Sequence, residues 1–241
     1  MRLDVAWLPG EKSPYCGKWD VVVVDVLRAS TSIITALANG AREIIPAMTI
    51  AEAKRSAGKM KKNSVLLCGE RGGYKISGFD MGNSPSDYTK DRVHGKSLVF
   101  SSTNGSVMLK KAAEKGGRVY VAGFVNMNAV VSLISSRNKD TLIACSGREG
   151  GFSLEDVVCA GMIADRVRNT GGDLECGDGA LSASVLYRHF ASDLAGMART
   201  SLHGKYLDSI GMGKDIPDCT TLNRYDVVPE MKNRRIICST L

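Results

Sequence analysis

Short runs of apolar, β-branched residues alternate with amphipathic stretches along most of the chain. The clearest run, residues 20–26, contains four consecutive valines and is typical of a strand buried on both faces of a sheet. Strands are also predicted at 42–46, 65–68, 97–100, 118–122 and 141–145, and the tail 216–237 has room for one more short strand.

Helical patterns fill the intervals between these runs. Thr49 and Ser153 stand where N-caps are expected, and Gly40 is a suitable helix end. The predicted helices cover 30–40, 50–60, 107–116, 127–136, 154–169 and most of 179–210, whereas 75–91 is a loop rich in Gly, Asn, Pro and Asp. Strands that alternate with helices predict a single three-layer α/β/α domain over 1–241, with a largely parallel or mixed sheet.

Composition narrows the class of protein. The chain of 241 residues is 44% hydrophobic and 24% charged, which is ordinary for a globular protein. No apolar run approaches about 18 residues, and the N-terminus lacks the apolar core of a signal peptide, so we expect a cytoplasmic protein without membrane association. Seven cysteines without a C-x-x-C pair, and three histidines without a ligand motif, argue against a disulfide framework and a zinc site.

The net charge of +7 indicates an anionic partner, but the basic residues are scattered. Their densest groups, 59–62 and 232–235, are typical of solvated turns or helix ends. Only 6% of residues are aromatic, and they do not alternate with basic residues as base-stacking surfaces do. We therefore expect a small anionic substrate and no nucleic acid. The sequence does not decide the oligomeric state, and a homodimer stays open.

Four loops that follow predicted strands carry the candidate chemistry. They lie at 25–31, 69–73, 101–105 and 146–150, and each combines hydroxyl or glycine residues with the start of a helix. Ligands of open α/β sheets bind at the carboxyl ends of strands, and helix N-termini offer N–H groups to phosphate. The predicted substrate contacts are Arg28, Ser30, Thr31, Arg71, Thr103, Asn104, Gly105, Ser146, Gly147 and Arg148.

Carboxylates occur in or directly after the same loops. Asp25, Glu70 and Asp156 are candidate ligands of Mg²⁺, which prefers oxygen donors and substrate phosphate. Asp25 is also the catalytic candidate, together with Glu149 as a general base or further ligand. Taken singly, these residues would be ordinary caps, turns or ion pairs, so the hypothesis rests on the convergence of the four loops. The chain has no P-loop, no D-x-D pair at Asp25 and no G-x-S-x-G elbow.

In their order and spacing, several segments resemble the 2-phosphosulfolactate phosphatase family across 21–229. They are VVVVDVLRASTSIITALANGA, GERGG, GFDMGNSP, STNGS and CSGREGGFSLEDVVCAG, followed by SLHGKYLDSIGMGKDI and CTTLNRYDVVP. The resemblance implies a Mg²⁺-dependent acid phosphatase that hydrolyses (2R)-2-phospho-3-sulfolactate to 3-sulfolactate and phosphate, a step in coenzyme M biosynthesis. It does not supply a nucleophile for this chain.

Several alternatives stay open at this point. The substrate is sulfolactate phosphate or another small phosphorylated hydroxy acid, and a non-catalytic polyanion-binding module is disfavoured because acids share the candidate loops. Attack by water is favoured over a phospho-Asp25 intermediate, because the second aspartate of the aspartyl-phosphate pattern is missing. His94, His189 and His203 have no assigned role, and a structural role is favoured for His203.

Overall fold

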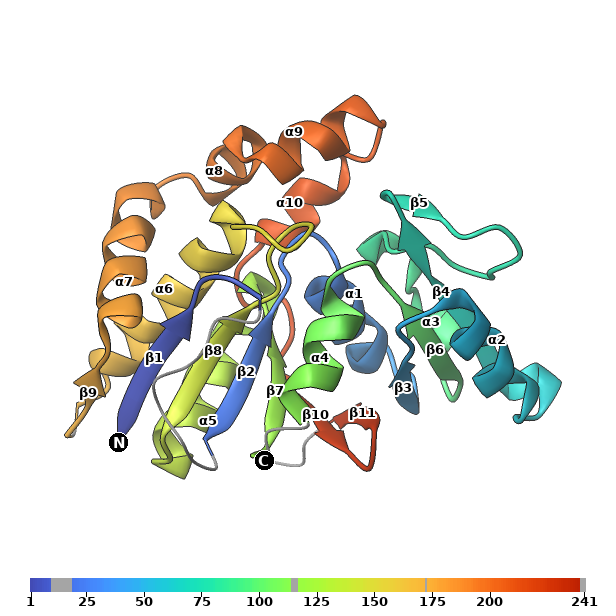
Figure 1. Ribbon diagram of the computed structural model, residues 1–241, viewed down its shortest axis with the longest axis horizontal. Helices are drawn as coiled ribbons and strands as arrows, with labels where there is room; N and C mark the ends of the chain where they lie inside the picture. The colour runs from blue at the N-terminus through green and yellow to red at the C-terminus, as the bar shows by residue number, and fades with distance from the viewer. Residues whose placement is uncertain (10–18, 114–116, 172, 239–241) are drawn as a thin grey trace.

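A computed structural model describes residues 1–9, 19–113, 117–171 and 173–238. An eleven-stranded mixed sheet carries helices on both faces, which confirms the predicted α/β class (Figure 1). The strands are β1 (Arg2–Ala6), β2 (Asp20–Val24), β3 (Glu43–Pro46), β4 (Val65–Arg71), β5 (Tyr74–Lys75), β6 (Ser97–Ser101), β7 (Val119–Ala122), β8 (Thr141–Cys145), β9 (Glu175–Cys176), β10 (Pro229–Lys232) and β11 (Arg235–Cys238).

Most helices follow the predicted intervals. The helices are α1 (Ala29–Ala38), α2 (Ile50–Gly58), α3 (Lys90–Val93), α4 (Gly105–Ala113), α5 (Met127–Arg137), α6 (Leu154–Arg168), α7 (Asp178–Phe190), α8 (Leu194–Thr200), α9 (Leu202–Ser209) and α10 (Asp215–Thr220). However, α3 begins within the predicted loop 75–91, and α10 lies in the tail, where only a strand is predicted. Thr49 caps α2 as predicted, since its hydroxyl accepts the N–H of Glu52. Ser153 occupies the N-cap position of α6 without forming a side-chain cap hydrogen bond. The predicted helix end at 114–116 and Cys16 lie outside the described residues.

Two parallel groups of strands make up most of the sheet. β7, β2, β8, β1 and β9 form one group, and β3, β6 and β4 form the other. The antiparallel hairpin of β10 and β11 joins them, and β5 pairs antiparallel with β4 at one edge. The sequence predicts at most one strand where this hairpin lies, and it does not predict β1, β5 or β9.

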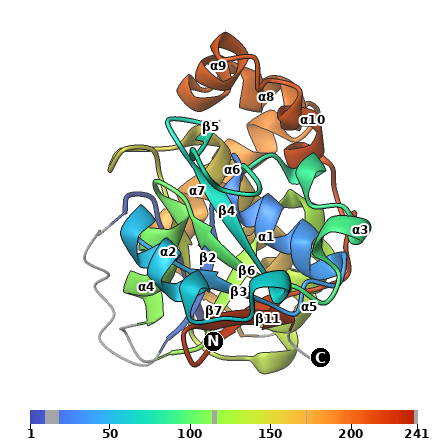
Figure 2. The same cartoon turned by 90° about the vertical axis from the view of Figure 1, so that its right-hand side faces the viewer.

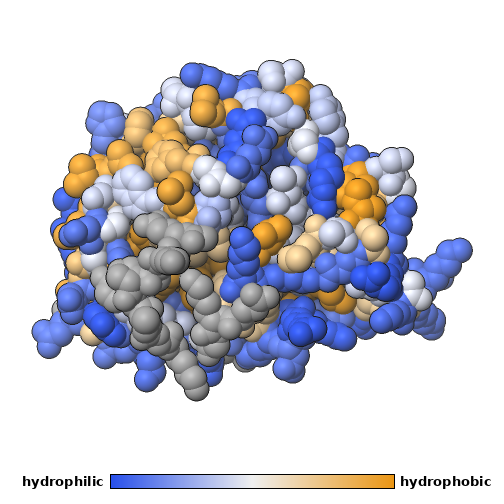
Figure 3. All heavy atoms as spheres, in the orientation of Figure 1, coloured by the Kyte–Doolittle hydropathy of each residue, from blue (hydrophilic) through white to orange (hydrophobic). Residues whose placement is uncertain are grey.

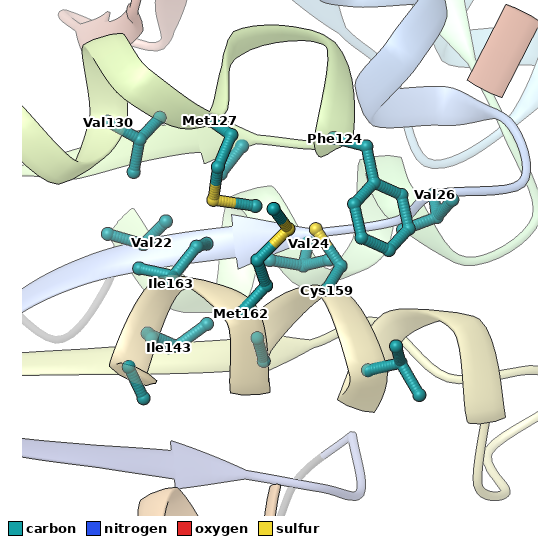
Figure 4. Close-up of a cluster of buried hydrophobic side chains, with 14 of the residues drawn as sticks. Val22, Val24, Val26, Phe124, Met127, Val130, Ile143, Cys159, Met162 and Ile163 are labelled. Atoms are coloured by element: carbon teal, nitrogen blue, oxygen red, sulfur yellow. The ribbon is translucent and has the colours of Figure 1, made fainter. Parts of the chain in front are cut away.

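The valines of β2 explain why this strand is central. All five residues of the strand are buried. Val22 and Val24 pack into the core formed with α5 and α6 (Figure 4). Val21 and Val23 pack on the opposite face with α1 and α4. A strand covered on both faces needs apolar side chains at successive positions. Each buried valine stabilises the fold by roughly 1.5–3 kcal/mol, which fixes the place of the loop that follows β2.

Helices α8, α9 and α10 lie across the upper end of the sheet in both views (Figures 1 and 2). We call these three helices the roof helices, and together they form the roof of the sheet. Hydrophilic side chains are spread over the face drawn in Figure 3 and do not form one stripe, in keeping with the scattered charges of the sequence. Among the described residues, the helices are too short or too polar for one to cross a bilayer.

Candidate active site

A pocket of about 90 Å³ lies beneath the roof, where β2, β4, β6 and β8 end. The residues that follow these strands form most of its wall, as the topology of parallel strands predicts. The lining residues are Asp25, Leu27, Arg28, Glu70, Gly72, Gly73, Asn83, Ser102, Thr103, Asn104, Arg148, Glu149, His203 and Tyr206. All four predicted loops contribute two or more of these residues, and the first contributes a buried acid together with an arginine.

Asp25 follows β2 directly and is only 7% exposed. The backbone N–H of Ala29 donates to its Oδ1 at 3.2 Å, and its own N–H donates to Ser30 Oγ at 2.9 Å. Burial raises its pKa to about 6; the charge of His203 and the Ala29 hydrogen bond lower it, whereas Glu70 raises it further. The carboxyl group therefore changes its protonation state close to neutral pH, where a catalytic acid or base is useful.

Glu70 lies near the end of β4 and connects two loops of the pocket. Its Oε1 accepts the N–H of Thr103 at 2.7 Å, and its Oε2 accepts the N–H of Gly73 at 2.9 Å. Because both oxygens are engaged with the backbone, the carboxylate holds the loop after β6 against the turn between β4 and β5. To act as the predicted metal ligand, Glu70 would have to use the same two oxygens that accept these backbone N–H groups.

Asp156 connects two other loops and does not line the pocket. Its Oδ1 accepts the N–H of Val26 at 2.8 Å, and its Oδ2 accepts the N–H of Gly147 at 3.1 Å. Burial raises its pKa well above the usual range, and the charges of Asp25 and Glu155 add to this effect. The structure therefore places Asp156 behind the pocket, as a link between the loops after β2 and β8.

The predicted arginines have different positions. Arg28 is buried in the pocket wall, where its guanidinium donates to Asp215 Oδ2 and to the carbonyl oxygen of Gly73, both at 2.6 Å. Arg148 lines the pocket, donates to the Leu202 carbonyl oxygen at 3.0 Å, and stacks 4.8 Å from the ring centroid of Tyr206.

Arg71 points away from the pocket. Its guanidinium donates to Ser101 Oγ at 2.9 Å and to the carbonyl oxygens of Glu70, Ser101 and Met48. These contacts secure the ends of β4 and β6. Its predicted contact with substrate therefore has no support in its placement.

Polar side chains from the loop after β6 face the pocket at the start of α4. Thr103 and Asn104 line it, and Asn104 Oδ1 accepts the N–H of Glu149 at 3.2 Å. The Glu149 side chain is 77% exposed and stands at the rim. An added Cβ at Gly105 would lie 2.8 Å from Asp25 Oδ2, so glycine lets the helix start approach the carboxylate. The positive end of the helix dipole suits a phosphate group, although the N–H of Ser106 is taken by Ser102 Oγ at 3.0 Å.

A family model of 2-phosphosulpholactate phosphatase matches residues 10–234. The chain belongs to the 2-phosphosulfolactate phosphatase family. Over 214 residues it is 39% identical to a protein of Caldanaerobacter subterraneus subsp. tengcongensis, covering 89% of this chain and 88% of that protein. A Thermotoga maritima protein is 40% identical over 212 residues, with 88% of each chain covered, and a Microcystis aeruginosa protein is 38% identical over 218 residues, with 90% of each covered. All three are named probable 2-phosphosulfolactate phosphatase.

Membership of the 2-phosphosulfolactate phosphatase family makes the chain a phosphoric monoester hydrolase. Seven of its predicted site residues line the pocket: Asp25, Arg28, Glu70, Thr103, Asn104, Arg148 and Glu149. The other predicted substrate contacts do not line the pocket, and several of them form hydrogen bonds with backbone groups instead. Thr31 Oγ1 donates to the Val26 carbonyl oxygen, Ser30 Oγ accepts the N–H of Asp25, and the N–H of Ser146 donates to the Val24 carbonyl oxygen.

Gly147 also lies behind the wall, with a positive φ of 65°. An added Cβ there would lie 2.2 Å from the Gly151 carbonyl oxygen, so this glycine shapes the turn that carries Arg148. Its N–H is taken by Asp156 and is not directed at a ligand in the pocket.

Sequence reasoning missed four residues that complete this phosphatase site. His203 and Tyr206 reach the pocket from α9, Asp215 from α10 holds Arg28, and Asn83 lines the pocket with its Oδ1 buried and without a hydrogen-bond partner. Asn83 lies in the loop 75–91, where the family-like segment GFDMGNSP was the available signal. His203, Tyr206 and Asp215 all lie in the family-like segment SLHGKYLDSIGMGKDI, which was the signal available for them, but no chemical motif within it indicates a site.

Some residues that line the pocket carry side-chain oxygens, which are the ligands that a hard cation such as Mg²⁺ prefers. Among the described residues, no group of three or more His, Cys, Asp and Glu side chains converges as a metal site, so the predicted trio of Asp25, Glu70 and Asp156 does not form one. Asp25 shares the pocket with the side-chain oxygens of Thr103 and Asn104. Mg²⁺ commonly takes one or two protein carboxylates and fills its other positions with water and substrate phosphate, and these residues fit that pattern.

Proposed function

We propose that the protein hydrolyses (2R)-2-phospho-3-sulfolactate to 3-sulfolactate and phosphate with Mg²⁺, as in coenzyme M biosynthesis, and that Asp25 is central to the reaction. Family membership supports the substrate class. The observation that carries the assignment is a small pocket in which the buried carboxylate of Asp25 lies with two anchored arginines at the start of a helix. This combination serves a phosphorylated substrate with further anionic groups.

The anchoring of the arginines supports recognition of a multiply charged substrate. Phosphosulfolactate carries phosphate, carboxylate and sulfonate groups, and guanidinium groups match the oxygens of all three. Arg28 is fixed by Asp215, which also accepts the hydroxyl of Ser84 at 2.6 Å. Arg148 is fixed by its stacking on Tyr206. Donors that are already oriented lose little freedom on binding, so they favour both affinity and alignment.

Hydrolysis of a phosphate monoester requires the site to lower the barrier by roughly 20 kcal/mol or more. In the favoured route, the Asp25 carboxylate accepts a proton from a water molecule as its oxygen attacks phosphorus, while the bond between phosphorus and the ester oxygen breaks. In the alternative route, the carboxylate itself attacks and a phospho-Asp25 intermediate is hydrolysed. Rapid quenching that traps a phosphoenzyme would establish the second route, and both routes need Asp25 ionised.

The proposed Mg²⁺ would be held by Asp25, directly or through water, with oxygen donors from Thr103, Asn104 and the substrate phosphate. When bound, it supplies polarisation of the phosphoryl oxygens and orientation of water. Glu70 contributes by holding the Thr103 backbone in place. The arginines and the start of α4 stabilise the negative charge of the phosphoryl group in the transition state.

The test is phosphate release from racemic 2-phospho-3-sulfolactate, with Mg²⁺ or with EDTA, beside phosphoglycolate and p-nitrophenyl phosphate. We expect fast, Mg²⁺-dependent release that favours the sulfonate, because a substrate without this group forgoes charge-assisted hydrogen bonds with an arginine that is already oriented. Equal release from all substrates would keep the phosphatase and discard the sulfolactate specificity. No release by folded protein would overturn the proposed function.

A further inference from the structure

His203 and Glu155 form a pair beside the pocket that the reaction described so far does not use. His203 lies in the first turn of α9 and lines the pocket, while Glu155 lies in the first turn of α6. The distance from His203 Nδ1 to Glu155 Oε1 is 3.1 Å. With Nδ1 engaged by the carboxylate, the other ring nitrogen, Nε2, is the one available to a ligand. Nε2 has no hydrogen-bond partner among the described residues.

The carboxylate of this pair is almost fully buried. Glu155 is 1% exposed, and its Oε2 has no hydrogen-bond partner. Burial raises its pKa, but the hydrogen bond and the charge of His203 outweigh this effect and bring the pKa below the usual range. The contact with this buried carboxylate fixes the orientation of the His203 ring.

His203 also stands between the pocket and a second hollow. A groove of about 600 Å³ is lined by residues of the loop before α6 and of α9, among them Ser153, Glu155 and Leu202. It shares Arg148, Glu149 and His203 with the wall of the pocket. The imidazole therefore reaches substrate on one side and lies beside an open groove on the other, where water can restore a proton after each turnover.

We propose that His203 donates the proton to the leaving oxygen of the substrate, and that Glu155 orients its ring; this rests on the proposed phosphatase function. The bond between phosphorus and the ester oxygen breaks, and its electron pair goes to that oxygen, which takes the proton from Nε2. Asp25 has accepted the proton of the attacking water, so the products are alcohol and phosphate. Asp25 then releases a proton to solvent and His203 regains one.

The chemistry of the substrate explains why such a donor is needed. The leaving group of a phosphorylated hydroxy acid is an aliphatic alkoxide, which is strongly basic and departs slowly unless it is protonated. A nitrophenolate leaving group is weakly basic and departs without a proton. A proton donor therefore contributes to the first reaction and little to the second, whereas a purely structural histidine affects both alike.

The test compares His203→Gln with the unaltered protein on phosphoglycolate and on p-nitrophenyl phosphate. We expect kcat on the alkyl ester to fall about 10²- to 10⁴-fold, the usual contribution of a proton donor, and kcat on the aryl ester to fall less than about tenfold. Equal losses on both esters would overturn the inference and leave the phosphatase intact. An unaltered protein that releases phosphate from neither of these esters nor from 2-phospho-3-sulfolactate would overturn the proposed function as well.

Two further variants keep the test independent of folding. His203→Gln leaves the Glu155 charge buried without its partner, so the double variant Glu155→Gln with His203→Gln removes both charges and should show the same selective loss. Glu155→Gln alone should lower the alkyl-to-aryl ratio of kcat in the same direction by a smaller factor. His189→Gln, at an exposed histidine of α7, should leave the ratio unchanged. A double variant with the unaltered ratio would overturn the inference.

Discussion

Both ends of the strands hold buried acids, but their partners differ. At the ends where β2 and β3 begin, Asp20 pairs with Arg137 at 2.8 Å, and Glu43 pairs with Arg235 at 2.6 Å. At the carboxyl ends, Asp25 and Glu70 accept backbone N–H groups and have no arginine partner within salt-bridge distance among the described residues. The first arrangement neutralises charge, whereas the second keeps carboxylates beside a pocket.

Asp25 and Glu43 show the consequence most clearly, since their exposed fractions are 7% and 6%. Burial raises the pKa of both carboxyl groups. For Glu43, hydrogen bonds from Ser97 and Arg235 outweigh burial and bring the pKa below its usual value. For Asp25, burial prevails and the pKa is about 6. The pKa of Asp25 stays high because its carboxyl group is enclosed more completely than that of Glu43 and, among the described residues, receives no arginine hydrogen bond.

The largest effect on stability is expected from Arg28→Ala. It leaves Asp215, which is 1% exposed, without its cation, and breaking a buried pair from one side costs about 3–5 kcal/mol of unfolding free energy. Arg235→Ala removes a half-exposed arginine from Glu43, and Ser97 remains as a partner, so the cost should be about 1 kcal/mol. Urea unfolding of the two variants measures the difference. Equal costs would contradict the argument that the burial of the arginine sets the cost of breaking the pair.

A pH-dependent effect of about 3 kcal/mol is expected from Asp25→Asn without metal. The folded-state pKa of about 6 exceeds the ordinary value of 3.8, so the folded protein binds an extra proton between these values. Stability from this group therefore falls as pH rises from about 4 to 6 and stays lower above it. The variant should match the unaltered protein below pH 4 and exceed it at pH 8. Unfolding in EDTA, measured across this pH range, tests this expectation. A difference in unfolding free energy between the variant and the unaltered protein that does not change with pH would contradict the burial argument.

Gly105→Ala should lower the unfolding free energy by about 1–3 kcal/mol, because it adds a methyl group to a closely packed region. The new Cβ would lie 2.7 Å from the Ala29 Cβ and 2.8 Å from Asp25 Oδ2, so the start of α4 must shift and turnover should fall as well. Gly58→Ala at the end of α2 is the control, because no atom lies within 4 Å of its added Cβ. Thermal unfolding and phosphate release of both variants test this, and equal behaviour would contradict it.

Glu70→Gln should have the smallest effect, about 1 kcal/mol in stability. The amide can accept only one of the two N–H groups, from Thr103 and Gly73, that the carboxylate accepts now. One loop of the pocket loosens, and kcat/KM should fall by about fivefold, as the same free energy predicts for a transition state. Steady-state kinetics together with urea unfolding measure both quantities. An unchanged kcat/KM would show that the Glu70 carboxylate does not position the loop.

Local patterns were sufficient for the elements that build the centre of the sheet. Residues 20–26 predict a strand because its apolar positions are contiguous, and Thr49 predicts the start of α2. β1 was missed because Asp4 and Arg2 dilute its pattern and its partner β8 is far away in the chain. The hairpin of β10 and β11 turns through Asn233 and Arg234, both with positive φ, where the usual signal would be a glycine.

The residues of the candidate site likewise divide into those that sequence patterns predict and those that tertiary packing places. Asp25, Arg28, Thr103 and Arg148 were found because the carboxyl ends of parallel strands must meet at one edge. Asp156 and Arg71 come from the same loops, yet their side chains turn to backbone groups behind the wall, and sequence gives no sign of that direction. His203 arrives on a roof helix, and its place depends on tertiary packing.

The most direct test of the site compares Asp25→Asn with Glu43→Gln in phosphate release from 2-phospho-3-sulfolactate with Mg²⁺. The two residues are nearly equally buried, and only Asp25 lines the pocket. We expect Asp25→Asn to lose at least about 10²-fold in kcat while staying folded, and Glu43→Gln to keep the rate of the unaltered protein. A rate near that of the unaltered protein in Asp25→Asn, or an equal loss in Glu43→Gln, would contradict the assignment of the chemistry to this pocket.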